Sequence, residues 1–218
     1  MQVQALEGLT MKLLLLGATG ATGHAVLTLA LRAGHEVTVF VRDPTAMRER
    51  AGQVRIAIGD ATSAQDLAAV LPGHDAVISA LGSGKSIKSD IASRAATALV
   101  VATRHTGVSR LVVLSAFGVG DSLDQTSTVQ KLMYRTVMRS LFADKAIADD
   151  LIRAGGQDWT LVHPVTLTNG PATDGAYRAG DRLPMKGMPK ISRADVATFM
   201  LTAAADPAWI HRTAVLSD

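Results

Sequence analysis

The sequence predicts an α/β protein with a Rossmann-like, doubly wound, mostly parallel sheet that has helices on both of its faces. Short runs rich in Val, Ile and Leu alternate with longer helical stretches, as in chains whose parallel strands are joined by helical crossovers. A glycine-rich segment stands between the first run and the first helical stretch. The chain has 218 residues, of which 48% are hydrophobic, so it can bury a core without disulfides or metals.

Each predicted strand is short and nearly all apolar, as expected for strands buried on both faces. The strands are expected at 12–16, 36–41, 54–58, 76–80, 110–114 and 160–163. The helices are expected at 21–33, 63–71, 89–105, within 126–154, and at 193–204. The segment 169–182 is expected to be a long loop or a small hairpin, because it is rich in Gly, Pro and Thr. We expect an N-terminal extension over 1–10 and a single domain over 11–218, whose C-terminal loops build the acceptor site.

Two helix starts carry capping signals. Asp43 precedes Pro44, which predicts an N-cap followed by a first-turn proline. Ser192 and Asp195 have the spacing of a capping box, with Asp in place of the usual Glu.

Composition and charge argue against several classes of protein. The absence of cysteine excludes a disulfide framework, a thiolate metal site and a cysteine nucleophile. The net charge is only +3 and aromatic residues make up 4%, so no nucleic-acid partner is expected. No apolar run reaches the ~18 residues of a membrane-spanning helix, and the histidines lack the spacing of metal ligands. We expect a cytoplasmic monomer or weak homodimer with no membrane contact and no metal.

The strongest motif is the glycine-rich loop Gly17–Gly23, a G-x-x-G-x-x-G variant of the dinucleotide-binding fingerprint. Gly17 would allow the tight turn, Gly20 would let the backbone approach a pyrophosphate, and Gly23 would let the helix pack closely on the strand. The helix N-terminus offers free N–H groups to phosphates. The other predicted contacts of this loop are Thr19, Ala21 and Thr22. The alternative is a glycine-rich turn that binds nothing, but its place in the first strand–helix unit favours dinucleotide binding.

The residues after the second strand indicate which dinucleotide binds. NAD-binding sites place an acidic residue there to hold the ribose hydroxyls, whereas an arginine accommodates the 2′-phosphate of NADP. The strand ends in Arg42, whose guanidinium can pair with a phosphate, and Arg48 could assist from the next turn. Asp43 could instead hold the ribose, but we assign it to the helix cap. NADP(H) is therefore the expected cofactor, and a solvated surface charge is the alternative for Arg42.

Further strand ends should line the same edge, because ligands of open α/β sheets lie outside the carboxyl ends of the strands. Asp60 could accept a hydrogen bond from the adenine amino group, and Ser115, the candidate catalytic residue, could bind the nicotinamide carboxamide or the acceptor. For Ser115 a strand-end hydroxyl bonded to the backbone is an equally weighted alternative. The remaining predicted contacts are Ala61 with Asp60, Leu81 and Gly82 after the fourth strand, Ala116 and Phe117 after Ser115, and Pro164 after the sixth strand.

Together these features resemble the atypical short-chain dehydrogenase/reductases of the NAD(P)H-binding type. The residues that carry the resemblance are Gly17–Gly23, 41–43, 59–60, 81–82, 114–117, 175–177 and 191–195. Within this family the pattern is most similar to the branch of NADPH-dependent flavin reductases and biliverdin-IXβ reductases. The resemblance implies NADPH and direct hydride transfer to an isoalloxazine or tetrapyrrole stacked on the nicotinamide.

The sequence departs from this superfamily in two places. Many of its dehydrogenases use a Tyr-x-x-x-Lys pair for proton transfer, but Lys145 is preceded four residues earlier by Leu141, and Tyr134 is followed four later by Met138. Alcohol–ketone chemistry by that route is not expected. Lys145 remains a candidate ribose ligand, with a solvated helix charge as the alternative.

The second departure concerns a histidine that the mammalian-type flavin reductases carry shortly after the sixth-strand proline. Here no histidine follows Pro164, whereas His163 precedes it and is expected to point into the core. This weakens biliverdin as the natural substrate. With no acid–base residue in view, we expect little dependence of the rate on pH.

The sequence thus predicts an NADPH-dependent reductase of a flat conjugated acceptor. FMN, riboflavin, a tetrapyrrole or a quinone fits this class, because the cofactor carries the difficult chemistry and the protein positions it. A non-catalytic sensor of the NADP redox state is the main alternative, and the missing tyrosine supports it. An isomerase or epimerase is disfavoured by the same absence.

Overall fold

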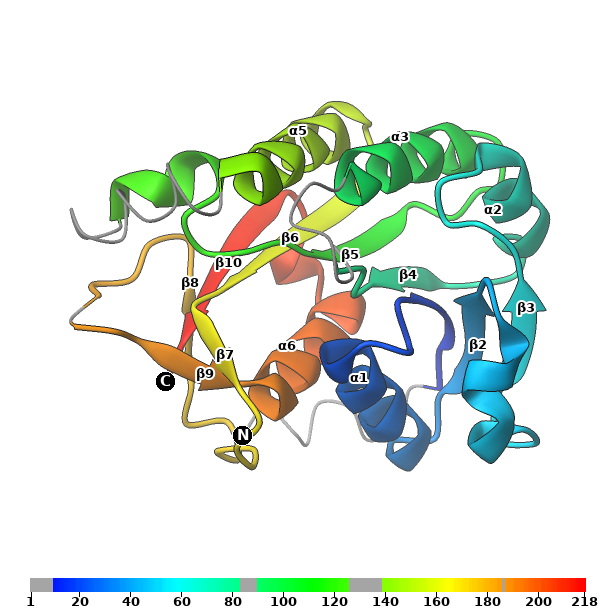
Figure 1. The fold of residues 1–218 in the computed structure, drawn as a ribbon, viewed down its shortest axis with the longest axis horizontal. Helices are drawn as coiled ribbons and strands as arrows, with labels where there is room; N and C mark the ends of the chain where they lie inside the picture. The colour runs from blue at the N-terminus through cyan, green and yellow to red at the C-terminus, as the bar shows by residue number, and fades with distance from the viewer. Residues whose placement is uncertain (1–9, 83–89, 126–138, 186) are drawn as a thin grey trace.

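The computed structural model describes residues 10–82, 90–125, 139–185 and 187–218. Its main sheet has eight strands in the order β3-β2-β1-β4-β5-β6-β10-β8, and every neighbouring pair is parallel except β10 with β8. Helices α2, α3 and α5 cover one face and α1 and α6 the other (Figure 1). The predicted Rossmann-like α/β fold is therefore confirmed.

The strands of the main sheet are β1 (Lys12–Leu16), β2 (Glu36–Val41), β3 (Arg55–Ile58), β4 (Ala76–Ser79), β5 (Arg110–Leu114), β6 (Asp158–Pro164), β8 (Arg178–Gly180) and β10 (Arg212–Ser217). The helices are α1 (Ala21–Arg32), α2 (Ala64–Val70), α3 (Ile91–Thr103), α5 (Arg139–Ala154) and α6 (Arg193–Ala205). A separate parallel pair joins β7 (Thr166–Thr168) to β9 (Lys190–Ser192). Short 3-10 helices are η2 (Pro44–Arg50), η3 (Gly120–Gln125) and η4 (Pro207–Trp209).

The core lies in two layers, one on each face of the sheet. In β1, Leu13 and Leu15 belong to the layer under α1 and α6, whereas Leu14 and Leu16 belong to the layer under α2, α3 and α5. All four are at most 1% exposed. Alternate residues of a strand point to opposite faces, so a strand covered on both sides must be apolar throughout.

The six predicted central strands are present with shifts of at most a few residues at their ends, but the sequence analysis missed four strands. The largest omission is β10, which lies inside the sheet between β6 and β8. Its buried apolar run is only Ala214–Leu216, flanked by polar residues, so it gave little strand signal. The segment 169–182, expected to be a loop or hairpin, ends in β8, which pairs with β10 instead of folding back on itself. The predicted extension 1–10 and the start of the 126–154 helix fall almost wholly outside the described residues.

Both predicted caps are present. Asp43 caps η2 by accepting a hydrogen bond from the Thr45 N–H at 2.9 Å, and Ser192 caps α6 by accepting one from the Asp195 N–H at 3.0 Å. A third cap joins two helices: the buried carboxylate of Asp144 on α5 accepts hydrogen bonds from backbone N–H groups in the first turn of α3. This contact fixes α5 beside the start of α3.

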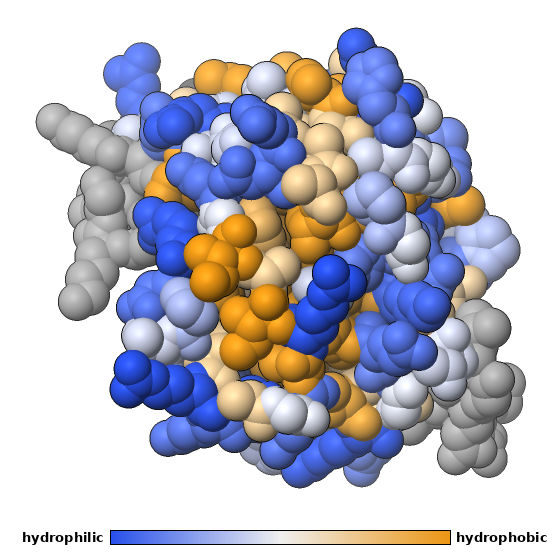
Figure 2. Space-filling model, turned by 90° about the vertical axis from the view of Figure 1, so that its right-hand side faces the viewer, coloured by the Kyte–Doolittle hydropathy of each residue, from blue (hydrophilic) through white to orange (hydrophobic). Residues whose placement is uncertain are grey.

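The free edge at β3 shows how the sheet ends toward solvent. Ile58 on this strand is 66% exposed. Figure 2 views the molecule from this side and shows hydrophobic residues gathered in the middle of a largely hydrophilic face. Among the described residues, no helix is both long enough and apolar enough to cross a membrane.

Candidate functional site

The glycine-rich loop joins β1 to α1, and its three glycines have different geometries. Gly17 has φ +80°, and a Cβ there would lie 2.6 Å from the carbonyl oxygen of Ala80. A Cβ at Gly23 would lie 2.0 Å from the carbonyl oxygen of Gly17. A Cβ at Gly20 would meet only that oxygen, at 3.4 Å, which is an ordinary contact. The fold itself therefore requires Gly17 and Gly23, while the space outside Gly20 is open.

Gly20 is also the N-cap of α1 and makes no side-chain cap. The first intrahelical bond runs from the His24 N–H to the Gly20 carbonyl at 2.8 Å, so the N–H groups of the first turn point out of the helix without a helical acceptor. No acidic residue lies in that turn. The arrangement is suited to an anion, because the helix dipole adds to these free donors.

A cleft of about 440 Å³ opens at this loop, along the carboxyl ends of β1 to β4. Eight of the predicted cofactor contacts line it: Gly17, Thr19, Gly20, Arg42, Asp60, Ala61, Leu81 and Gly82. Of the other loop positions, which form the first turn of α1, Ala21 is exposed, whereas Thr22 and Gly23 are buried. The carboxyl edge is where ligands of this sheet type bind.

Two arginines flank one carboxylate at the far end of this cleft. Arg42 and Arg94 are both exposed and both line the cleft, and each is close enough to lower the pKa of Asp60 electrostatically. The larger causes of that lowered pKa are the hydrogen bonds that Asp60 accepts from the Thr62 N–H and hydroxyl, each 2.9 Å long. Arg94 in turn donates to the Thr62 hydroxyl at 3.2 Å. The sequence analysis missed Arg94, because it lies on α3, far along the chain from the loop.

Asp43, the competing ribose ligand, is occupied by its capping role. One of its carboxylate oxygens accepts hydrogen bonds from both the N–H and the hydroxyl of Thr45, at 2.9 Å and 2.7 Å. These bonds lower the pKa of the Asp43 carboxyl below its usual value. Within the described residues, Arg42 makes no hydrogen bond, so it is the freer of the two groups.

The other predicted contacts lie farther along the same edge and do not line this cleft. Ser115 follows β5, which lies beside β4 in the sheet. Its N–H donates to the Val162 carbonyl at 2.8 Å. Phe117 is 3% exposed and packs in the core, and its N–H bonds the Pro164 carbonyl at 3.0 Å. The remaining two predicted contacts are Ala116, which is half-buried, and Lys145 on α5.

Ser115 does not bond the backbone through its hydroxyl, which was the alternative considered for it. Its Oγ donates to Asp149 Oδ2 at 3.0 Å, and the same carboxylate oxygen lies 2.9 Å from Nε2 of His163. The histidine does point into the core, as expected. The sequence analysis placed no titratable group beside Ser115, and the structure places two. The available signal was a histidine in an apolar strand, because a buried imidazole must find polar partners.

Lys145 is not a solvated helix charge. Its Nζ donates to the Leu114 carbonyl at 3.4 Å, directly before Ser115. Burial lowers the pKa of this ammonium group, and the nearby carboxylates of Asp149 and Asp144 oppose that shift. Lys145 and Asp149 are four residues apart on α5, so both reach the end of β5 from one helix face.

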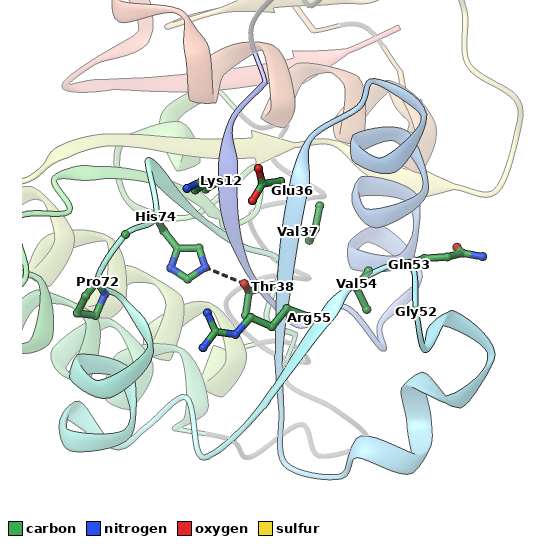
Figure 3. Close-up of a pocket in the computed structure, with 11 residues that line it drawn as sticks. Lys12, Glu36, Val37, Thr38, Gly52, Gln53, Val54, Arg55, Pro72 and His74 are labelled. Atoms are coloured by element: carbon green, nitrogen blue, oxygen red, sulfur yellow. Dashed lines mark hydrogen bonds between the residues drawn. The ribbon is translucent and has the colours of Figure 1, made fainter.

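A different cleft, of about 450 Å³, lies at the amino ends of the strands, at the end of the sheet opposite the glycine loop (Figure 3). It is lined by the starts of β1, β2 and β3 and by the turn before β4. In Figure 3, His74 reaches Thr38, with Nε2 2.8 Å from the hydroxyl oxygen. Its Nδ1 lies 3.0 Å from the Leu71 carbonyl oxygen and must donate to it, so in the neutral imidazole Nε2 accepts from Thr38. The histidine thus has a structural role at the edge opposite the glycine loop.

Among the described residues, no three His, Cys, Asp or Glu side chains are grouped to hold a metal ion.

Several known proteins are similar to this chain over most of its length. The chain is 27% identical over 204 residues to a Bacillus subtilis protein named uncharacterized sugar epimerase YhfK, covering 88% of this chain and 87% of that protein. It is 24% identical to the phenylcoumaran benzylic ether reductase POP1 of Populus trichocarpa, over 92% of this chain and 67% of that protein. The structure of ChuY, an anaerobillin reductase from Escherichia coli O157:H7, superposes with a TM-score of 0.78 at 26% identity, covering 94% of this chain and 96% of that one.

A family model also matches most of the chain. Residues 17–207 match the NAD(P)H-binding family, from the first glycine of the loop to just past the end of α6. A nicotinamide cofactor and an oxidoreductase-like architecture follow from that match and from the reductase structures that resemble this chain. The chain belongs to the NAD(P)H-binding family.

Proposed function

We propose that this protein is an NADPH-dependent reductase that passes a hydride to a flat conjugated acceptor: a flavin, a linear tetrapyrrole or a quinone. The observation that carries the proposal is the pair of exposed arginines, Arg42 and Arg94, at the end of the cleft that starts at Gly20. The glycine loop and the open helix N-terminus fit a pyrophosphate, and a second anionic group would lie near the arginines.

NADP(H) is favoured over NAD(H) by the charges at that end. An NAD site needs a free carboxylate for the ribose hydroxyls, but Asp43 is engaged by Thr45 and Asp60 by Thr62. Two guanidinium groups can instead share a 2′-phosphate through charge-assisted hydrogen bonds.

Bound NADPH would supply the hydride, and the residues of this chain would position it. The loop would hold the pyrophosphate, Lys145 would hold the ribose, and Ser115 would lie beside the nicotinamide and the acceptor. Orientation of donor and acceptor can provide much of the rate acceleration. The chain needs no Tyr-x-x-x-Lys pair for this chemistry, and Leu141 stands where that tyrosine would be.

The names of three similar proteins bear on the reaction. ChuY is called an anaerobillin reductase, which supports a tetrapyrrole, and the Populus protein is called a reductase. The Bacillus protein is called a sugar epimerase, but the missing tyrosine argues against epimerase chemistry by the Tyr-x-x-x-Lys route in this chain.

Steady-state oxidation of NADPH with FMN, riboflavin, biliverdin and a quinone tests the proposal. We expect turnover with at least one acceptor and a lower Kd for NADPH than for NADH. Tight NADPH binding without turnover would instead favour the sensor, and equal affinity for both cofactors would refute the role of the arginines.

A further inference from the structure

A continuous chain of hydrogen bonds runs inward from Ser115. Asp149 Oδ2 accepts from Ser115 Oγ at 3.0 Å and lies 2.9 Å from His163 Nε2. On the other side of the imidazole, Nδ1 lies 3.1 Å from Ser122 Oγ. Ser115 follows β5, Asp149 lies on α5, His163 on β6 and Ser122 on η3. In the same order, these side chains are 6%, 1%, 0% and 3% exposed.

Fold stability alone gives little reason to bury these four hydrogen-bonded side chains. A buried carboxylate and its polar partners are costly to desolvate, and apolar residues of similar volume often serve the fold as well or better. The carboxylate of Asp149 is shared between an imidazole and the hydroxyl that ends at the proposed nicotinamide site. Its position therefore calls for a functional account.

Ser122 can satisfy His163 in either protonation state. When the imidazole is neutral with its proton on Nε2, the Ser122 hydroxyl can donate to Nδ1. When the imidazole is protonated, Nδ1–H can donate to Ser122 Oγ, and the hydroxyl can turn to the Val119 carbonyl, 2.7 Å away. The Gly118 N–H donates to Ser122 Oγ at 2.8 Å in both cases. A histidine with partners in both states can gain and lose a proton without leaving a buried group unpaired.

The outer end of the chain reaches solvent by a separate route. Ser122 and His163 lie at the floor of a cleft of about 420 Å³ on the α5 side of β6 and β10. Its walls carry Arg153, Asp181, Arg182, His211 and Arg212, and Arg212 is paired with Asp181. This cleft shares no lining residue with the one at the glycine loop.

We infer that Ser115, Asp149, His163 and Ser122 form a proton relay, which serves acceptors that must gain a proton together with the hydride. This inference rests on the proposed reductase function. A linear tetrapyrrole is such an acceptor, because a hydride added at carbon leaves a negative charge on nitrogen. A flavin is not, because hydride addition at N5 gives a stable anion.

The steps of the relay balance. The O–H bond of Ser115 breaks and its proton goes to the acceptor nitrogen. Ser115 takes a proton from the carboxyl group of Asp149, which has taken it from Nε2 of neutral His163. As Nε2 loses its proton, Nδ1 takes one from Ser122, and Ser122 regains one from water in the cleft. The imidazole returns to its Nε2–H form before the next turnover. The net reaction consumes one NADPH, one proton and one acceptor, and gives NADP⁺ and the reduced acceptor.

Comparison of two acceptors with one set of variants separates this role from a structural one. We would measure kcat with biliverdin and with FMN for the wild type, Asp149→Asn, His163→Gln and Ser122→Ala. The ratio of kcat with biliverdin to kcat with FMN should fall at least tenfold in each variant. Asp150→Asn is the matched control on the same helix, because its carboxylate is 77% exposed and pairs only with Arg153 among the described residues, so its ratio should not change. Equal losses with both acceptors would overturn the relay.

A measurement on the wild type tests the relay even if a variant does not fold. In D₂O, kcat with biliverdin should fall at least twofold, while kcat with FMN should stay close to its value in H₂O. Equal solvent isotope effects would overturn the relay. So would a wild type that reduces FMN but not biliverdin, and that result would leave the reductase proposal intact. If the wild type oxidised NADPH with none of the tested acceptors, the proposed function itself would be refuted.

Discussion

The three loop glycines should separate cofactor binding from folding, and Gly20→Val is the decisive change. A Cβ at this position lies 3.4 Å from the Gly17 carbonyl oxygen, an ordinary contact. The fold should lose only the N-cap preference of glycine, about 1 kcal/mol, or about 2–4 °C in Tm for a chain of this size. The side chain would occupy the proposed pyrophosphate position. Overpacking of that kind costs about 1–3 kcal/mol, so NADPH should bind about 5- to 150-fold more weakly.

Gly23→Ala should show the reverse pattern. Its Cβ would lie 2.0 Å from the backbone oxygen of Gly17, and neither helix nor strand can move away cheaply. We expect a loss of about 3 kcal/mol in the free energy of unfolding, or about 6–12 °C in Tm. Thermal melts and fluorescence titration of NADPH measure both quantities. A Gly20→Val protein that binds NADPH as the wild type does would refute the assignment of this loop.

Four further predictions follow from the site and the core. Arg42→Ala should weaken NADPH binding by about 1.5–3 kcal/mol and leave NADH binding nearly unchanged, as titration of both cofactors would show. Arg94→Ala should act in the same direction. The control is Arg104→Ala, which removes an exposed arginine at the C-terminal cap of the same helix and should change neither affinity. Ser115→Ala should slow FMN reduction about tenfold or less, and a thousandfold loss would contradict a mainly positional role. Burial, with a smaller contribution from Asp195, raises the pKa of Tyr177 to about 12, so the folded state keeps this phenol neutral. The buried neutral phenol costs the fold nothing below pH about 10, the pKa of tyrosine in the unfolded chain. As the pH rises from about 10 to about 12, the unfolded chain ionises first, and the free energy of unfolding should fall by about 3 kcal/mol. Tyr177→Phe should remove this alkaline loss in denaturation curves, and a curve unchanged from the wild type would contradict it.

Much of the fold could be predicted because its signals are local. The strands β1 and β2, the loop at Gly17 and the caps at Asp43 and Ser192 each follow from residues adjacent in the sequence. The missing Tyr-x-x-x-Lys pair could also be read directly. Such features depend on hydrophobic periodicity and turn chemistry, which need no knowledge of tertiary packing.

The parts that could not be predicted depend on which elements become neighbours. Arg94 reaches the cleft only because α3 starts beside the carboxyl end of β4. Asp149 meets His163 and Ser115 only because α5 lies over β5 and β6. Lys145 reads as a surface charge in the sequence because its burial depends on the same helix position. None of these contacts has a local pattern, so sequence reasoning identified residues of the cleft at the glycine loop and missed the polar side chains behind Ser115.

The position of β10 bears on how the protein folds during synthesis. This strand is hydrogen-bonded to both β6 and β8. The whole segment from β7 to η4, which includes α6, precedes it in the chain. Until residues 212–217 leave the ribosome, β6 has an unpaired edge with buried-type side chains such as Leu161. An open apolar edge of this kind pairs readily with other chains. We therefore expect nascent chains stalled before β10 to depend on chaperones, and pulse proteolysis of such chains to cleave near β6.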